Sequence, residues 1–142
     1  SGYIFLWNDC LISWKSALQT TVALSTAEAE YISLCSASQE AIFLRSLVYD
    51  MGQPPTKPTV IYEDNQSCIF LTKNVVSNAR TKHIDIKYHF TREKITSGEL
   101  EVEYCCTENM IADLLTKPLN NSRHKVLTEK ILTGKMSIGG VY

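Results

Sequence analysis

The chain has 142 residues, which indicates one domain that buries about two-thirds of the surface exposed by its unfolded chain. Its composition, 44% hydrophobic and 20% charged without low-complexity stretches, excludes a disordered or fibrous protein. The apolar runs are too short to span a bilayer and the N-terminus does not resemble a secretory leader, so we expect an intracellular protein with no membrane partner. A formal net charge of −1 gives no overall attraction to nucleic acid, so such binding would require a local basic cluster.

The first elements predicted along the chain are two strands that form a hairpin. Residues 3–7 and 10–15 are rich in strand-forming side chains and flank the turn-prone pair at 8–9. The second strand has the composition to extend through residues 20–22. We therefore expect an antiparallel pair at the start of the fold.

A long helix and a buried strand follow the hairpin. Ser25 and Glu28 have the spacing of a capping box, and apolar residues then recur at helical intervals up to Gly52, which ends the helix. Residues 59–62 form a short apolar run typical of a buried strand, and the next helix is predicted over residues 65–74. These signals place a strand between two helices.

The second half of the chain predicts a loop at 75–82, a helix over 83–96 and a strand over 99–104 whose acidic and apolar residues alternate. Thr107 is a candidate cap for a helix that runs to Lys117, and a last helix covers about residues 122–132. The order β-β-α-β-α-α-β-α-α predicts a mixed sheet with helices, of the α/β or α+β class.

The five cysteines form no C-x-x-C pair and have no histidine at the spacing of a zinc site. Reduced thiols are the expected state, and Cys35 and Cys68 fall in apolar helical patterns where a cysteine acts as a small hydrophobic residue. Trp7 and Trp14 are predicted to lie in the core rather than to act as stacking platforms for bases.

Three acidic residues lie where a predicted element begins or ends: Glu30 in the first turns of the long helix, Asp64 after the buried strand, and Asp113 in a short late helix. Carboxylates that converge at a sheet end are the ligands that magnesium requires in phosphodiester hydrolysis. The simpler alternative is a helix-dipole partner at Glu30, an N-cap at Asp64 and a solvated side chain at Asp113. On spacing alone, this simpler alternative is preferred.

Six blocks of the sequence are distinctive in combination: SGY (1–3), ISWK (12–15), STAEAEYI (25–32), YEDNQS (62–67), ARTKHIDIKYHF (79–90) and IADLLTKP (111–118). Together, and in this order, they resemble the ribonuclease H domain in the Pol polyprotein of copia-type LTR retrotransposons. The resemblance covers about residues 1–119, which we interpret as the ribonuclease H-like domain, and we interpret residues 120–142 as a C-terminal helix and tail.

The resemblance implies a five-stranded mixed sheet flanked by helices, which hydrolyses the RNA strand of RNA–DNA hybrids. It also implies two divalent ions, Mg²⁺ or Mn²⁺, held by four carboxylates. Glu30 would then be the helix glutamate, Asp64 the aspartate at the end of the fourth strand, and Asp113 that of the late helix. Glu28 is an alternative to Glu30, but we assign it to the capping box.

Two departures from the family pattern leave the enzymatic activity uncertain. The family's first aspartate lies on a central strand that precedes the SGY block, and Asp9, in the hairpin turn, cannot replace it. The loop at 105–108 lacks the histidine that many relatives carry, and we do not expect His83 or His89 to take over its role in proton transfer. A metal cluster of these histidines with Asp85 is a further alternative, but a polar helix surface explains them more simply.

Residues 80–94 carry an excess of basic side chains: Arg80, Lys82, Lys87, Arg92 and Lys94. Such a cluster can bind a phosphate backbone without regard to sequence, and the resemblance favours this over a merely solvated helix. Asn65 and Gln66 either contact the minor groove of the hybrid or serve only at the start of their helix.

The expected function is therefore hydrolysis of RNA in RNA–DNA hybrids, impaired in this chain by the missing first strand. The expected partners are the hybrid and the reverse transcriptase and integrase regions of the polyprotein, in a cytoplasmic virus-like particle or the nucleus. The alternatives are a remnant or domesticated module that binds nucleic acid or protein without cutting, and a connecting domain whose carboxylates are incidental.

Overall fold

The mixed α/β architecture predicted from the sequence is confirmed by the structure, a computed structural model that describes residues 1–20, 22–74 and 82–133, with only the backbone of residues 82–85. These ranges contain five α-helices and two small sheets. In chain order the elements are β1 (Gly2–Trp7), β2 (Cys10–Ser16), α1 (Thr26–Asp50), β3 (Thr59–Glu63), α2 (Gln66–Lys73), α3 (Lys82–Thr96), β4 (Leu100–Tyr104), a 3₁₀ turn η1 (Thr107–Asn109), α4 (Asp113–Thr116) and α5 (Asn121–Thr133).

The predicted hairpin is formed by β1 and β2, which pair antiparallel with Trp7 opposite Cys10. Asn8 and Asp9 both adopt positive φ, 48° and 61°, as a tight two-residue turn between twisted strands requires. The predicted extension through 20–22 is wrong at the positions that the structure describes, because β2 ends at Ser16. Position 21 lies outside the described residues. The last backbone contact is from Ala17 N–H to the Ser1 carbonyl, beyond which the described chain has no facing strand.

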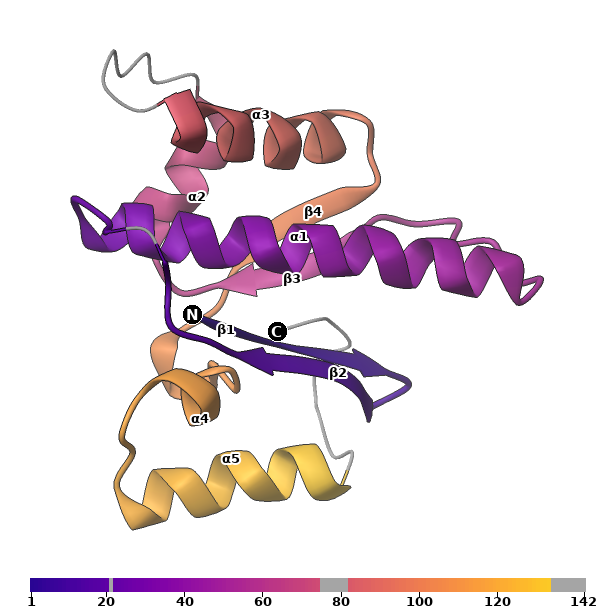
Figure 1. Cartoon of the computed structure of the whole chain (residues 1–142). Coiled ribbons are helices and arrows are strands. Elements are labelled where there is room, and N and C mark those ends of the chain that lie inside the picture. The colour runs from indigo at the N-terminus through magenta and orange to yellow at the C-terminus, as the bar shows by residue number, and fades with distance from the viewer. Residues whose placement is uncertain (21, 75–81, 134–142) are drawn as a thin grey trace.

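The second sheet consists of β3 and β4, which pair parallel from Thr59 opposite Leu100 to Glu63 opposite Tyr104. In Figure 1 this sheet lies above the β1–β2 hairpin, α1 crosses in front of it, α2 and α3 lie above, and α4 and α5 lie below. Helix α1 contacts both β1 and β3. It is therefore the element that holds the two sheets side by side.

Helix α1 begins as the capping box predicts. Glu28 N–H donates to Ser25 Oγ at 3.1 Å, while the Glu28 carboxylate accepts from the Leu24 N–H at 2.5 Å. The helix ends before Gly52, whose φ of +80° suits a residue without a side chain. Both ends of this helix thus follow from local chemistry.

Two apolar clusters form the core. The first surrounds α1 and includes Phe5, Tyr31 and Ile61; the second joins Ile4 of β1 to Ile111 and Leu127 near the C-terminal helices. Successive residues of β1 point to opposite faces, so Ile4 and Phe5 enter different clusters. Strand β1 is consequently buried on both faces.

The helix predicted from Thr107 to Lys117 is wrong in its middle. The structure has a 3₁₀ turn over Thr107–Asn109 and a separate short helix, α4, because Met110 adopts an extended conformation (ψ 100°) that interrupts the helix. Met110 and Ile111 are both buried in the second cluster, and packing there replaces the helical path.

The burial predicted from the sequence is confirmed for Cys35 and Cys68 and is wrong for one tryptophan. Cys35 and Cys68 are buried as predicted, and all five cysteines are free thiols. Trp14 exposes 62% of its surface, so its predicted place in the core is wrong, whereas Trp7 is half-buried. The reason is that β2 is the outer strand of its hairpin and is exposed along almost all of its length.

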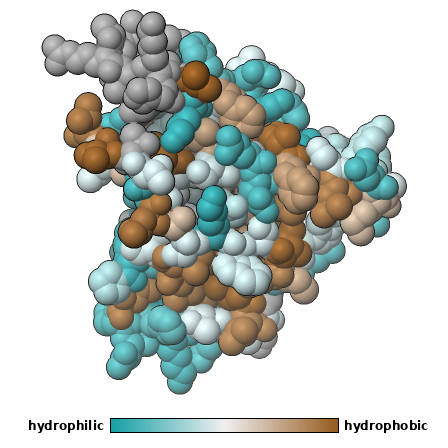
Figure 2. Space-filling view, in the orientation of Figure 1, coloured by the Kyte–Doolittle hydropathy of each residue, from teal (hydrophilic) through white to brown (hydrophobic). Residues whose placement is uncertain are grey.

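Apolar side chains also reach the surface elsewhere. Figure 2 shows hydrophobic residues at several separate places on one face of the molecule.

Among the described residues, none of the helices combines the length and the apolar character needed to cross a bilayer.

Candidate active site

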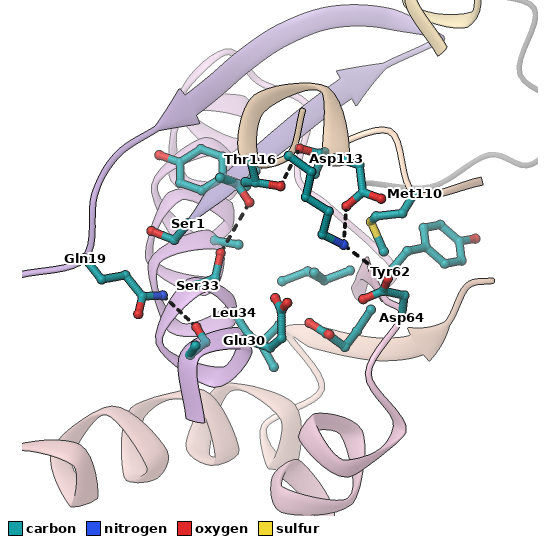
Figure 3. A pocket seen from close by; sticks show the side chains of 18 residues that line it. Ser1, Gln19, Glu30, Ser33, Leu34, Tyr62, Asp64, Met110, Asp113 and Thr116 are labelled. Carbon is teal, nitrogen blue, oxygen red and sulfur yellow. Dashed lines mark hydrogen bonds and ion pairs between the residues drawn. The ribbon is translucent and has the colours of Figure 1, made fainter. Parts of the chain in front are cut away.

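A cavity of about 290 Å³ lies where the start of β1, the end of β3, α1 and α4 face one another. Its walls come from segments far apart in the chain, including Gly2 of β1, Ser33 of α1 and Tyr62 of β3. Figure 3 shows polar and charged side chains pointing into it from opposite sides. It is therefore a site that only the folded chain assembles.

The three carboxylates predicted from the sequence all line this cavity. Glu30 comes from the second turn of α1, Asp64 from the residue after β3, and Asp113 from the first residue of α4 (Figure 3). The simpler alternative is wrong for two of them. Asn65 rather than Asp64 caps α2, and Asp113 is 3% exposed rather than solvated.

Two cations and a hydroxyl hold the aspartates in place. Lys117 Nζ lies 2.8 Å from Asp113 Oδ1 and 3.9 Å from Asp64 Oδ2, so it bridges the two. Arg123 Nη2 of α5 donates to Asp113 Oδ2 at 2.6 Å. Thr107 Oγ1 donates to Asp64 Oδ2 at 3.0 Å. Asp113 is thus contacted through both of its carboxylate oxygens, and Asp64 through Oδ2 alone.

These partners were not predicted from the sequence. The spacing of Asp113 and Lys117, four residues apart on a helix, was a usable signal because such residues are neighbours on the helix surface. Arg123 gave no such signal, since its contact depends on how α5 packs against the preceding turn.

Several carboxyl groups lie close together in this partly buried cavity, and their burial and charges shift the pKa values of its ionisable groups. Burial, and next the charge of Asp64, raise the pKa of Glu30. Burial alone would lower the pKa of Lys117, but its hydrogen bond to Asp113 and the surrounding negative charges raise it on balance. The ammonium group therefore stays charged between the aspartates.

Glu63 is a fourth carboxylate on the cavity wall that sequence reasoning missed. It is 7% exposed, its Oε1 accepts from the Asn65 N–H at 3.0 Å, and burial raises its pKa to about 7, with the Glu30 and Asp64 charges adding to the effect. The available signal was the alternation along β3, which puts Glu63 on the same face as the buried Ile61.

The donor set fits a divalent cation in its chemistry, since oxygen ligands from several carboxylates are what Mg²⁺ and Mn²⁺ prefer. Within the described ranges, however, no three acidic, histidine or cysteine side chains are close enough to hold an ion as they stand. Instead, the positive charge between Asp64 and Asp113 belongs to Lys117. Glu30, Asp64 and Asp113 are the residues that would hold a metal.

The predicted substrate-binding residues are distributed around the site. Asn65 Oδ1 accepts from Cys68 N–H at 3.1 Å as the cap of α2, and Gln66 beside it is exposed. Lys87 is half-buried on α3 and does not line the cavity. Arg80 lies outside the described residues, as does the side chain of Lys82 on the first residue of α3.

Two other residues of the basic stretch are engaged within the fold. Arg92 donates to the carbonyls of Leu71 and Asn74, and Lys94 pairs with Glu99 at 3.0 Å. These contacts tie α3 to α2 and to the start of β4, so neither charge is freely available to a phosphate backbone.

Known proteins similar to this chain are polyproteins of mobile elements. It is 40% identical over 131 residues to the retrovirus-related Pol polyprotein from transposon TNT 1-94 of Nicotiana tabacum, which covers 92% of the chain and 10% of the relative. It is 39% identical over 143 residues to that from transposon RE2 of Arabidopsis thaliana, covering 99% of the chain and 10% of the relative. It is 31% identical over 132 residues to the transposon Ty1-JR1 Gag-Pol polyprotein of Saccharomyces cerevisiae, covering 91% of the chain and 7% of the relative.

The match is to one short part of much longer proteins, because the chain spans only 7% to 10% of the length of these curated relatives. No solved structure and no protein-family model matches it. The aligned regions nevertheless cover 92% to 99% of the chain, and the longest of them includes the elements that contribute to the cavity. The chain is therefore homologous to a segment of the Pol polyproteins of copia-type retrotransposons.

Proposed function

We propose that this chain is the ribonuclease H-type domain of a retrotransposon Pol polyprotein, whose site hydrolyses the RNA strand of RNA–DNA hybrids. The observation that carries the proposal is the convergence of Glu30, Asp64 and Asp113 on one cavity from three separate elements. These are the residues that the sequence resemblance assigns to the site. In the polyprotein, residues 1–119 would form the domain and 120–142 its C-terminal helix and tail, beside the reverse transcriptase and integrase regions.

The proposed cofactor is Mg²⁺ or Mn²⁺, with two ions expected in the family's intact domain. When bound, divalent ions supply an activated water and stabilise the leaving oxygen of a phosphodiester. The chain's own residues supply the binding geometry: Thr107 and Arg123 orient Asp64 and Asp113, and α1 presents Glu30 opposite them. The proposed hybrid contacts are Asn65 and Gln66 beside the cavity, and Arg80, Lys82 and Lys87 on or before α3.

The space between the two sheets supports a place for the family's first strand. A second, separate cavity of about 170 Å³ is lined by Phe5, Leu6 and Trp7 of β1 and by Thr59 of β3. The start of β1 thus faces the end of β3, and the end of β1 faces the start of β3. Each strand pairs on one side only in the described residues, and a strand between them would complete a five-stranded sheet.

A second candidate function is a module that binds nucleic acid or protein without cutting. The observation that favours it is that Asp113 is already neutralised by two cations in a site where no described trio of ligands is close enough to hold a metal. The two candidates differ in whether a bound RNA–DNA hybrid is cut.

The test compares this chain with a chimera in which the residues that precede the matched segment in the TNT 1-94 polyprotein are joined to Ser1. Both are incubated with a labelled RNA–DNA hybrid and Mg²⁺ or Mn²⁺, with Asp64→Asn versions as matched controls. We expect metal-dependent cutting of the RNA strand by the chimera, little or none by the chain alone, and none by either Asp64→Asn protein.

Binding of the same hybrid is measured in parallel by fluorescence anisotropy. A folded chimera that binds the hybrid but never cuts it would refute the enzymatic proposal and favour the binding module. Cutting of equal strength in the Asp64→Asn chimera would show that this cavity is not the active site.

A further inference from the structure

Lys117 occupies a special place among the charged residues of the cavity. Its ammonium group is 2.8 Å from Asp113 Oδ1 and 3.9 Å from Asp64 Oδ2, between two of the three carboxylates proposed as metal ligands. The aspartate side chains are 4% and 14% exposed, whereas that of Lys117 is 44% exposed. A partly exposed cation therefore lies between two less accessible anions.

The second cation, Arg123, has a different role. It contacts the other oxygen of Asp113, at 2.6 Å, and also donates to the Thr107 carbonyl, so it ties α5 to the turn before α4. Its side chain is less exposed than that of Lys117, at 28%. Arg123 can thus keep Asp113 in place if the lysine leaves.

Lys117 has the properties of an exchangeable group. It follows the last residue of α4, and its flexible stem carries a compact, strongly hydrated charge that can move into water without breaking the helix. Because Lys117 is 44% exposed, its charge regains hydration when released, and Asp113 still keeps its contact with Arg123. Lys117 is therefore placed to leave the aspartates when a divalent cation binds them.

We propose that the ammonium group of Lys117 is the resident cation of this site, holding Asp64 and Asp113 together and competing with a divalent ion for them. The inference rests on the proposed function for the identity of the competing ion. It accounts for two aspartates that stay oriented toward one point in a site where the described ligands do not close around a metal.

The test measures Mn²⁺ binding to the 142-residue chain by isothermal titration calorimetry, without nucleic acid and without an activity readout. The variants Lys117→Met and Lys117→Gln remove the charge, and Lys117→Arg retains it. Lys125→Met is the matched control, since Lys125 and Glu129 form another i,i+4 pair, 4.0 Å apart, on α5. Circular dichroism confirms that each variant is folded.

We expect the two neutral variants to bind Mn²⁺ about tenfold more tightly, the effect of removing one positive charge about 6 Å from a divalent ion in a water-like dielectric. Lys117→Arg and Lys125→Met should bind as the unaltered chain does. Adding Asp64→Asn to Lys117→Met should abolish the gain, which would locate the ion at this aspartate.

Equal binding by the unaltered chain and both neutral variants would overturn the competition while leaving a metal site in place. The absence of saturable Mn²⁺ binding in every protein would overturn the competition, whereas the proposed function is decided separately by the cutting assay on the chimera. Tighter binding in the neutral variants would support Lys117 as the competitor even if the chain cuts no hybrid.

Discussion

Replacing Glu63 by glutamine should change the stability of the protein in a pH-dependent way. Glu63 is 7% exposed, and burial raises its pKa from 4.5 to about 7. Glutamine has the same size and keeps an oxygen that can accept from the Asn65 N–H, a hydrogen bond of 3.0 Å in the native protein. The substitution therefore removes the ionisable group with little change in packing.

The direction of the pH dependence follows from which state, folded or unfolded, binds the Glu63 proton more tightly. Between about pH 4.5 and pH 7 the folded protein binds the Glu63 proton more tightly than the unfolded chain, so the free energy of unfolding falls as pH rises through this window. A difference of about 2.5 pKa units corresponds to roughly 3 kcal/mol once the carboxyl is ionised in both states. Glutamine does not titrate and so escapes this loss.

The assay is urea unfolding followed by circular dichroism in a metal chelator, at about pH 4.5, 6 and 8. The Glu63→Gln variant should match the unaltered protein at the lowest pH and exceed it by about 3 kcal/mol at the highest. A stability difference that stays constant across the three pH values, or that favours glutamate at high pH, would refute the inference that burial raises the pKa of Glu63.

Substitutions at three further positions test the contacts that support the site, each followed by the urea midpoint. Asn65→Ala should lower the free energy of unfolding by about 1 kcal/mol because it removes the cap of α2, whereas Asn65→Asp should keep it; equal loss in both would argue against capping. Arg123→Met should cost about 2 kcal/mol because it removes a 2.6 Å charged hydrogen bond to the buried Asp113, and an unchanged midpoint would contradict that contact. Gly2→Ala should destabilise by about 1–3 kcal/mol, since a Cβ there would lie 2.9 Å from both the Lys15 carbonyl and Thr116 Cγ2; a neutral effect would mean that β1 and α4 are not packed this closely.

The features that the sequence predicts well are those determined by neighbouring residues. The capping box of Ser25 and Glu28, the turn at Asn8 and Asp9, and the glycine after α1 each depend on atoms within a few positions of one another. The convergence of the three carboxylates was expected through a family resemblance, because spacing alone favoured separate roles for them. The ribonuclease H-like fold itself stays a prediction.

The features that the sequence predicts poorly depend on contacts between distant residues. Thr107 was assigned to a helix cap, but its hydroxyl donates to Asp64, 43 positions away. The break before α4 reflects the burial of Met110 and Ile111 against β1 and α5, which local helix propensity does not include. The inward position of Glu63 required knowing which face of β3 is covered.

The division of the strands into two sheets has a consequence for how the protein opens. No backbone ladder joins β1–β2 to β3–β4 in the described part of the chain, and two-stranded sheets are marginal on their own. Native-state hydrogen exchange should therefore resolve two cooperative units: the β1–β2 amides should exchange through a local opening of lower free energy, and those of β3, β4 and the helices around them through a separate one of higher free energy. A strand bound between the sheets would join them into one cooperative unit. Slower exchange of the β1 amides would therefore detect binding of that strand without an activity assay.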